Sequence, residues 1–240
     1  MNLLAIDFET ADHGPDSACA VGLVKIINGR IISTRHHLIR PPRRTFTFSH
    51  IHGISWEDVR SEPDFGTLWP EIEEQCEDAE YFLAHNASFD RNVLRACCER
   101  YGLPVPKIPF ICTVQVARKG WSIYPTKLSS VCDFLEIDLK HHNAESDALA
   151  CAQIAISALR TGFAIDTCVL GSRTKSRPSK KSTPAPPAVV PAAIVTSEER
   201  TSFQSNEVKD QKRSQSLPML AVVGIVFLII AIWVLSKLHG

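Results

Sequence analysis

Residues 3–10 read Leu-Leu-Ala-Ile-Asp-Phe-Glu-Thr, an apolar run that ends in two acids separated by one residue. Alternate side chains of a β-strand share one face, so Asp7 and Glu9 are expected to project together from the carboxyl end of a buried strand. Carboxylates held this close repel each other and lose hydration, which favours a cation between them. Oxygen ligands suit a hard ion such as Mg²⁺ or Mn²⁺. The plainer alternative is a strand end that reaches solvent.

The following segments predict the rest of a sheet and its helices. Residues 18–28 and 31–39 are strand-like, and Asn28-Gly29 between them is typical of a hairpin turn. Three antiparallel strands followed by alternating helices and strands predict an α/β fold, with a mixed five-stranded sheet of order 3-2-1-4-5 flanked by helices. The other expected elements are strands at 81–84 and 108–114, a short helix at 56–59 capped by Ser55, a helix capped by Asn86 or Ser88 that runs to about 101, and helices at 64–76, 127–135 and 144–160.

Two of these helices place an acid on the face that should be buried. Asp90 begins the apolar stripe of one helix and Asp147 begins that of another. Acids rarely lie on such faces unpaired. With the first strand central and both helices packed on it, four carboxylates would meet and could hold two divalent ions roughly 3.5–4 Å apart, an arrangement suited to displacement at phosphorus. His142 stands five residues before Asp147, with His141 beside it.

Charge and cysteine usage separate two parts of the chain. Residues 1–170 carry 16 Lys and Arg against 22 Asp and Glu, a net charge of −6, whereas residues 171–240 carry 10 against 4, a net charge of +6. An acidic domain binds polyanions only where metal ions or a local basic patch offset its charge. The eight cysteines have no C-x-x-C or zinc-like spacing, so reduced core thiols in a cytosolic compartment are expected.

The C-terminal part predicts a linker and a membrane span after a folded domain at 1–170. Residues 171–216 are rich in Ser, Pro, Ala and Lys, which is typical of a disordered linker. Residues 217–236 are uncharged, and at 1.5 Å per residue a helix of this length spans roughly 30 Å, enough to cross a bilayer. Basic residues gather before this segment, which predicts a single-pass protein with its domain in the cytoplasm. The N-terminus shows no signal-peptide pattern.

Three segments resemble the motifs of one family. They are Asp-Phe-Glu-Thr at 7–10, His-Asn-Ala-Ser-Phe-Asp at 85–90 and His-Asn-Ala-Glu-Ser-Asp at 142–147. Together they resemble the three motifs of the DEDDh 3′→5′ exonucleases, the relatives of the proofreading epsilon subunit of bacterial replicative DNA polymerase, which have a ribonuclease H-like fold. The resemblance covers about residues 1–165, and it carries the further expectation of a bacterial inner membrane for the C-terminal helix.

The resemblance implies a role for each motif residue. Asp7, Glu9, Asp90 and Asp147 would bind two Mg²⁺ or Mn²⁺ ions, and His142 would be the general base that takes a proton from the attacking water. His141 is a competitor for that role, although the spacing favours His142. The expected activity is release of nucleoside 5′-monophosphates from the 3′ ends of single-stranded DNA or RNA, with DNA favoured.

Other residues are expected to contact the substrate, each with a structural alternative. In the structural alternative these residues pack in the core, cap a helix or, in the case of the histidine, stand in a turn, and none of them contacts a ligand. An RNA-specific 3′ exonuclease and a catalytically silent, membrane-anchored nucleic-acid-binding module stay open as alternative functions, and the sequence names no protein partner. The loop arginines Arg40, Arg43 and Arg44 either grip phosphates or are solvated. The candidate substrate-binding residues are Phe8, Glu9, Thr10, His52, Asn86 and Phe89.

Overall fold

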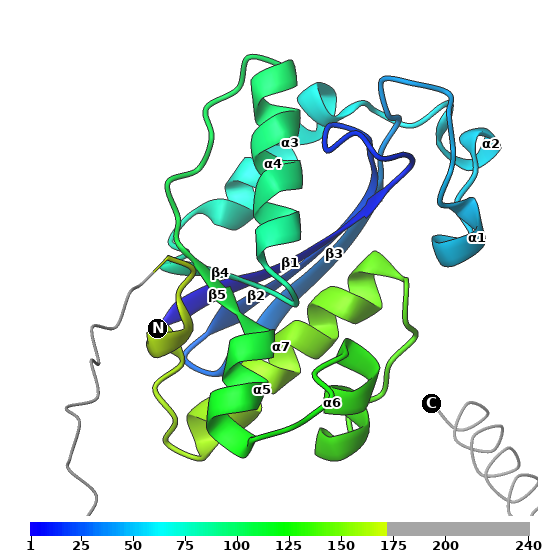
Figure 1. Cartoon of the computed structure of the whole chain (residues 1–240). Coiled ribbons are helices and arrows are strands. Elements are labelled where there is room, and N and C mark those ends of the chain that lie inside the picture. The colour runs from blue at the N-terminus through cyan, green and yellow to red at the C-terminus, as the bar shows by residue number, and fades with distance from the viewer. Residues whose placement is uncertain (172–240) are drawn as a thin grey trace, which may run out of the picture. The chain divides into compact units, whose positions relative to one another are not determined.

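A mixed five-stranded sheet lies at the centre of the domain (Figure 1). The computed structural model describes residues 1–171, so most of the expected linker and the whole of the expected membrane helix at 217–236 lie outside the described residues. The strand order is β3-β2-β1-β4-β5, which confirms the predicted order. β2 pairs antiparallel with β1 and β3, while β4 is parallel to β1 and β5. The strands are β1 (Asn2–Thr10), β2 (Ala18–Ile27), β3 (Arg30–Leu38), β4 (Tyr81–Ala84) and β5 (Phe110–Cys112).

The helices largely follow the sequence pattern, with three differences. α1 and α5 were not expected. α4 begins after Ala87 with no side-chain cap, so the predicted capping by Asn86 or Ser88 is wrong: Asn86 adopts a positive φ of 62° and accepts the Ser88 hydroxyl instead. The helices are α1 (Ser49–His52), α2 (Trp56–Val59), α3 (Phe65–Cys76), α4 (Ser88–Arg100), α5 (Thr113–Trp121), α6 (Leu128–Leu135) and α7 (Ala144–Arg160), followed by the 3₁₀ turn η1 (Ile165–Cys168). None of the helices within residues 1–171 is long and apolar enough to cross a membrane.

Alternation along β1 divides the core into two layers. Leu4, Ile6 and Phe8 face α3 and α4 on one side of the sheet. Leu3 and Ala5 face α5, α6 and α7 on the other side (Figure 1). Because side chains two apart share a face, Asp7 and Glu9 continue the row that looks toward α7. All eight cysteines are unpaired and seven are buried, which agrees with the expected core thiols.

α7 approaches β2 closely at Gly22. This glycine lies opposite Asp7 in the β1–β2 ladder. A Cβ at Gly22 would fall on the backbone carbonyl of Ala144, the first residue of α7, and would come within 2.6 Å of the Glu145 nitrogen. Only a residue without a side chain therefore allows α7 to begin beside Asp7, which brings Asp147 toward the end of β1.

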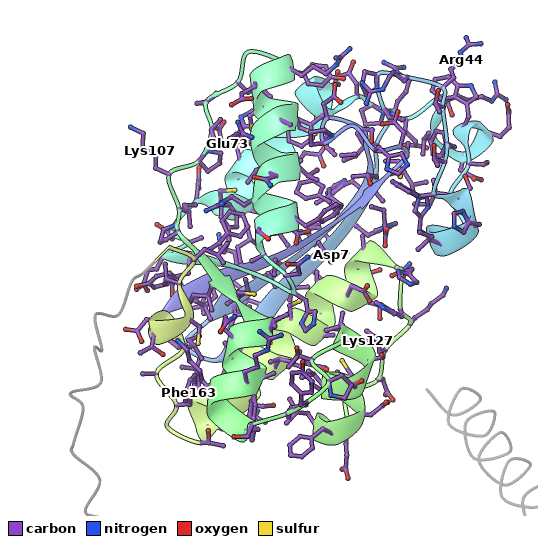
Figure 2. All side chains as sticks on the ribbon, viewed as in Figure 1. Asp7, Arg44, Glu73, Lys107, Lys127 and Phe163 are labelled. Atoms are coloured by element: carbon purple, nitrogen blue, oxygen red, sulfur yellow. The ribbon has the colours of Figure 1, made fainter. Side chains whose placement is uncertain are left out.

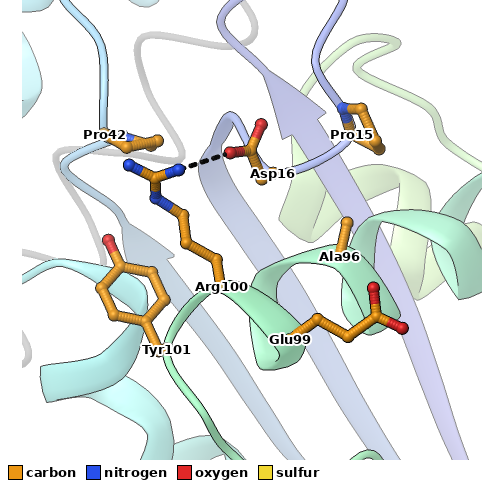
Figure 3. A pocket seen from close by; sticks show the side chains of 7 residues that line it. All are labelled: Pro15, Asp16, Pro42, Ala96, Glu99, Arg100 and Tyr101. Carbon is orange, nitrogen blue, oxygen red and sulfur yellow. Dashed lines mark hydrogen bonds and ion pairs between the residues drawn. The ribbon is translucent and has the colours of Figure 1, made fainter.

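An ionic network fixes the loop that follows β1. The Arg43 guanidinium donates from Nε to Asp12 at 2.8 Å and from a terminal nitrogen to Asp16 at 2.7 Å. Arg100, at the end of α4, binds Asp16 at 3.0 Å beside an open hollow of 840 Å³ (Figure 3). Hydrogen bonds from Arg43 lower the pKa of Asp12 to about 2. The loop between β1 and β2 is thus held to α4 and to the loop before α1.

The close approach at Gly22 is testable by substitution. Gly22→Ala should destabilise the domain by about 1–3 kcal/mol, because either the strand or the start of α7 must move. Gly120→Ala is the matched control: its Cβ would meet the Phe163 ring at an ordinary 3.8 Å, and alanine is favoured over glycine in a helix. Denaturant unfolding checks both. Wild-type stability in Gly22→Ala would show that α7 does not need this contact.

Candidate active site

Three carboxylates meet where the end of β1 faces the start of α7. Asp7 and Glu9 come from β1 and Asp147 from the first turn of α7. One oxygen from each of them lies within 4.8 Å of the others, a spacing that could hold a metal ion. Asp7 lies between the α4 layer and the α7 layer (Figure 2). The predicted convergence of β1 with α7 is therefore present.

Asp90 joins this group from the opposite layer. It lies in the first turn of α4, is 1% exposed, and accepts the backbone N–H of Phe8 at Oδ1 over 3.1 Å. Phe8 stands between the two strand acids, so this bond places Asp90 directly beside them. After burial, the charge of Asp90 is the next largest cause that raises the pKa of Asp7. All four predicted acids thus lie in one site.

The acids repel one another strongly. Burial raises the pKa of Asp7 well above its ordinary range, and the charges of Asp90, Asp147 and Glu9 raise it further. Burial raises the pKa of Glu9 to about 7, with a contribution from Asp147. Burial also raises the pKa of Asp90 to about 7, against the lowering effect of the Phe8 N–H. Without a cation, this site favours bound protons near neutral pH.

One oxygen of the site is left without a partner. Asp147 is 4% exposed, and its Oδ1 forms no hydrogen bond within the part of the chain that the structure describes. A buried carboxylate oxygen without a donor is costly, and a divalent cation would satisfy it. Three clustered carboxylates with Asp90 beside them, none of them paired with a lysine or arginine within residues 1–171, are also the oxygen-rich donor set that Mg²⁺ and Mn²⁺ prefer. The residues present therefore fit a divalent metal.

Two histidines lie beside Asp147, and they differ in their contacts. The ring of His141 contacts Asp147 Oδ2 through Nδ1 at 3.0 Å, and the backbone N–H of His142 donates to the same oxygen at 3.2 Å. The two rings stack with centroids 3.9 Å apart. Within residues 1–171, no hydrogen bond is made to the ring of His142, whose backbone has a positive φ of 64°. His142 thus presents a free ring, whereas His141 is engaged with a site carboxylate.

Two candidate substrate residues, Phe8 on β1 and His52 on α1, make contacts within the fold. The Phe8 ring is 2% exposed and packs against Phe65, so it lies in the core rather than at the mouth of the site. His52 contacts the carbonyl of Thr10 through Nε2 at 3.2 Å, and its Nδ1 accepts the Ile54 N–H at 3.1 Å. These bonds fix the neutral Nε2–H form of His52, which holds α1 to the end of β1.

Phe89 and Asn86 are on the open side. Phe89 is 44% exposed and helps to line a cavity of 250 Å³ together with Thr10, His13 and Phe48. Asn86 is exposed at the turn before α4. Both side chains are exposed, and their predicted contact with the substrate stays a prediction.

Sequence reasoning missed the roles of His85 and of the arginines. His85 belongs to the second motif, and its ring joins Thr113 at 2.9 Å to the carbonyl of Thr126 at 2.9 Å, which ties β4 to α5 and to the loop before α6. The sequence signals this role only through the position of His85, directly after the apolar strand and before a turn that contains no glycine. Arg40 and Arg43 are paired with aspartates, and Arg44 lies over the Trp56 ring at 5.2 Å.

Comparison with known proteins finds similarity to exonucleases and to a DNA polymerase. A protein-family model described as RNase T exonuclease matches residues 4–155. A PolC-type DNA polymerase III from Thermotoga maritima is 33% identical over 156 residues, which is 63% of this chain and 11% of that protein. Exodeoxyribonuclease 10 from Escherichia coli K12 is 30% identical over 152 residues, covering 59% of this chain and 61% of the relative. The chain thus spans about a tenth of the first of these relatives and less than two thirds of the second.

A solved structure is similar to this chain in fold. Exonuclease X in complex with 5′ overhanging duplex DNA has a TM-score of 0.57 and 26% identity, over 69% of this chain and 96% of that one. The α/β sheet is accordingly of the ribonuclease H-like type. With the family match, the sheet order and the four converging acids of the three motifs, the chain belongs to the RNase T exonuclease family of DEDDh type.

Proposed function

We propose that the protein is a metal-dependent 3′→5′ exonuclease that hydrolyses single-stranded nucleic acid to nucleoside 5′-monophosphates. The observation that carries this proposal is the meeting of four acids from β1, α4 and α7 beside a histidine with a free ring. In this proposal Asp7, Glu9, Asp90 and Asp147 hold two Mg²⁺ or Mn²⁺ ions. Bound ions would lower the pKa of an attacking water and stabilise negative charge on the phosphate.

The proposed base is His142. A general base must have a nitrogen free to accept a proton from water, and the His142 ring is unbonded within the described residues. Burial, and then the charge of His141, lower the pKa of His142 against the raising effect of Asp147, which favours the neutral ring that can accept a proton. His141 binds Asp147 through its ring, so we assign it the task of orienting that carboxylate.

DNA is the proposed substrate in preference to RNA. The relatives of 30% identity or more that support this choice include an exodeoxyribonuclease and the PolC-type DNA polymerase III of the comparison. Thr10 and Phe89, the sequence neighbours of Glu9 and Asp90, border the 250 Å³ cavity, and we propose that the terminal nucleotide lies there.

We further propose that residues 217–236 tether the enzyme to a membrane, with the domain in the cytoplasm of a bacterial cell. The support is the sequence alone: twenty uncharged residues with a basic segment before them. This places the proposed activity near the inner membrane. A silent nucleic-acid-binding module is disfavoured, because it would gain nothing from four clustered acids that raise one another's pKa values.

The proposed metal site predicts an unusual dependence of stability on pH. In metal-free protein, Glu9 and Asp90 bind protons more tightly when folded, with pKa values of about 7, than when unfolded. Stability should therefore fall as pH rises from about 4 to above 7, and Mg²⁺ or Mn²⁺ should restore it at pH 8. Thermal unfolding in EDTA and in each metal measures this.

Asp7→Asn tests the same site by removing one charge. It should raise the stability of metal-free protein at pH 8 and reduce the gain from metal. Asp133→Asn, at an exposed position of α6, is the control and should change neither quantity. A metal response in Asp7→Asn equal to that of the wild type would rule out the site.

The catalytic assignments predict distinct losses of turnover. Asp7→Ala should abolish release of 5′-mononucleotides from a labelled oligonucleotide, and His142→Ala should lower kcat by about 10²–10⁴-fold. His141→Ala should cost less, because its ring orients Asp147 rather than accepting a proton. Matched DNA and RNA oligomers measure the sugar preference. A greater loss in His141→Ala than in His142→Ala would reverse the two roles, and faster hydrolysis of RNA would favour the RNA-specific alternative.

The membrane proposal predicts a change in location on truncation. Full-length protein should sediment with membranes, and protein ending at residue 216 should remain in the supernatant with its hydrolytic rate unchanged. Fractionation followed by the same assay measures both. Sedimentation of the truncated protein with membranes would refute the proposed tether.

A further inference from the structure

A groove with basic walls runs along the outer side of α4. It has a volume of 580 Å³ and lies between α4 and the loop at 102–109 that leads to β5. Arg91 and Arg95 line it from the helix, and Lys107 lines it from the loop. Val105, which is 39% exposed, and Ile108 supply apolar surface between these cations.

The charge of this groove opposes that of the domain. Residues 1–170 have a net charge of −6, yet no acid lines the groove and three cations do. Arg91 and Lys107 form no ion pair within residues 1–171. Arg95 pairs with Glu99 on the exposed surface of the same helix at 3.1 Å, a type of contact that contributes little and can be exchanged. The groove is therefore complementary to a polyanion.

The groove adjoins the 250 Å³ cavity in which we place the terminal nucleotide. Arg91 directly follows the buried Asp90. Asn92 lines both the groove and the 250 Å³ cavity that Thr10 and Phe89 border. A polymer whose end lies in that cavity can cross Asn92 and continue into the groove.

We propose that this groove binds the upstream part of a single strand of nucleic acid whose 3′ end occupies the active site. The inference rests on the proposed function. Arg91, Arg95 and Lys107 contact backbone phosphates, while Val105 and Ile108 lie against sugars and bases. The segment at 171–181, which follows the groove residue Leu170 in the sequence, is an alternative occupant. Its charge argues against it, because it carries five cations and no acid and the cations of the groove would repel it.

The test compares substrate lengths in full-length protein. The variant Arg91→Gln/Lys107→Gln removes two groove cations. Arg30→Gln/Arg160→Gln is the matched control, because it removes two exposed cations that line a separate hollow of 470 Å³ near the β2–β3 turn. Steady-state hydrolysis is measured on a DNA trimer and on a 20-mer of the same 3′ sequence. Binding of the labelled 20-mer is measured by fluorescence anisotropy in EDTA, where hydrolysis does not run.

The groove variant should keep the wild-type kcat and KM on the trimer and raise KM on the 20-mer by about tenfold. Its binding to the 20-mer should depend less on salt, with a slope smaller by about 1.4 for two lost phosphate contacts on a single strand. The control variant should match the wild type in both assays.

Two results would overturn the proposal. Equal 20-mer binding and KM in the groove variant and the wild type would show that no strand lies there, and in that case loss of binding to an acidic peptide would assign the groove to a protein partner. An equal rise in KM on both lengths would place the effect in the active site. Failure of the proposed function is distinguishable. The wild type would then degrade neither length, while anisotropy would still measure whether the groove variant binds the 20-mer more weakly than the wild type.

Discussion

Repulsion among four carboxylates is the constraint on which the structure of this domain depends. Asp7, Glu9 and Asp147 lie within one ligand sphere, and Asp90 is fixed beside them by the Phe8 N–H. Such an arrangement lowers stability unless protons or cations enter it, so the rest of the fold must hold these groups together. Burial of the two apolar layers that pack on the faces of β1 supplies the free energy that holds the acids together. The acids lie where the rows of buried side chains along β1 end.

The features around the acids fit this constraint. Because Gly22 has no side chain, the start of α7 can approach the β1–β2 ladder beside Asp7. His52 and His85 use both ring nitrogens to fasten neighbouring loops to the ends of β1 and β4. A site whose members repel one another is thereby held in place by neutral hydrogen bonds that do not add charge to it.

Much of the fold was predictable because its signals are local. The alternation in β1, the Asn28-Gly29 turn and the stripe that Asp147 begins each report on one element, and the sheet order follows from the rules of connection. α5 escaped prediction because Val114, Val116 and Gly120 weaken its helical pattern, while burial of Val116 and Ala117 stabilises it in the fold.

The acids of the site were predictable from their positions on buried faces, but their neighbours were not. The contact of His141 with Asp147, and the burial of the Phe8 ring, depend on side-chain orientations that spacing does not encode. The pairing of Arg43 with Asp12 and Asp16 joins residues about thirty positions apart, and no periodicity signals it.

That pairing also shapes the electric field at the mouth of the site. Asp12, Asp16, Arg43 and Arg100 cancel to zero net charge, so this network adds no net charge beside the loop after β1. On the α4 side, Arg91 and Lys107 form no ion pair within residues 1–171, so a polyanion would be attracted toward that side at long range. Association of a polyanion with the domain would favour this side and would slow as ionic strength rises. The ionic network that stiffens the loop after β1 would therefore also influence the side from which a polyanion approaches.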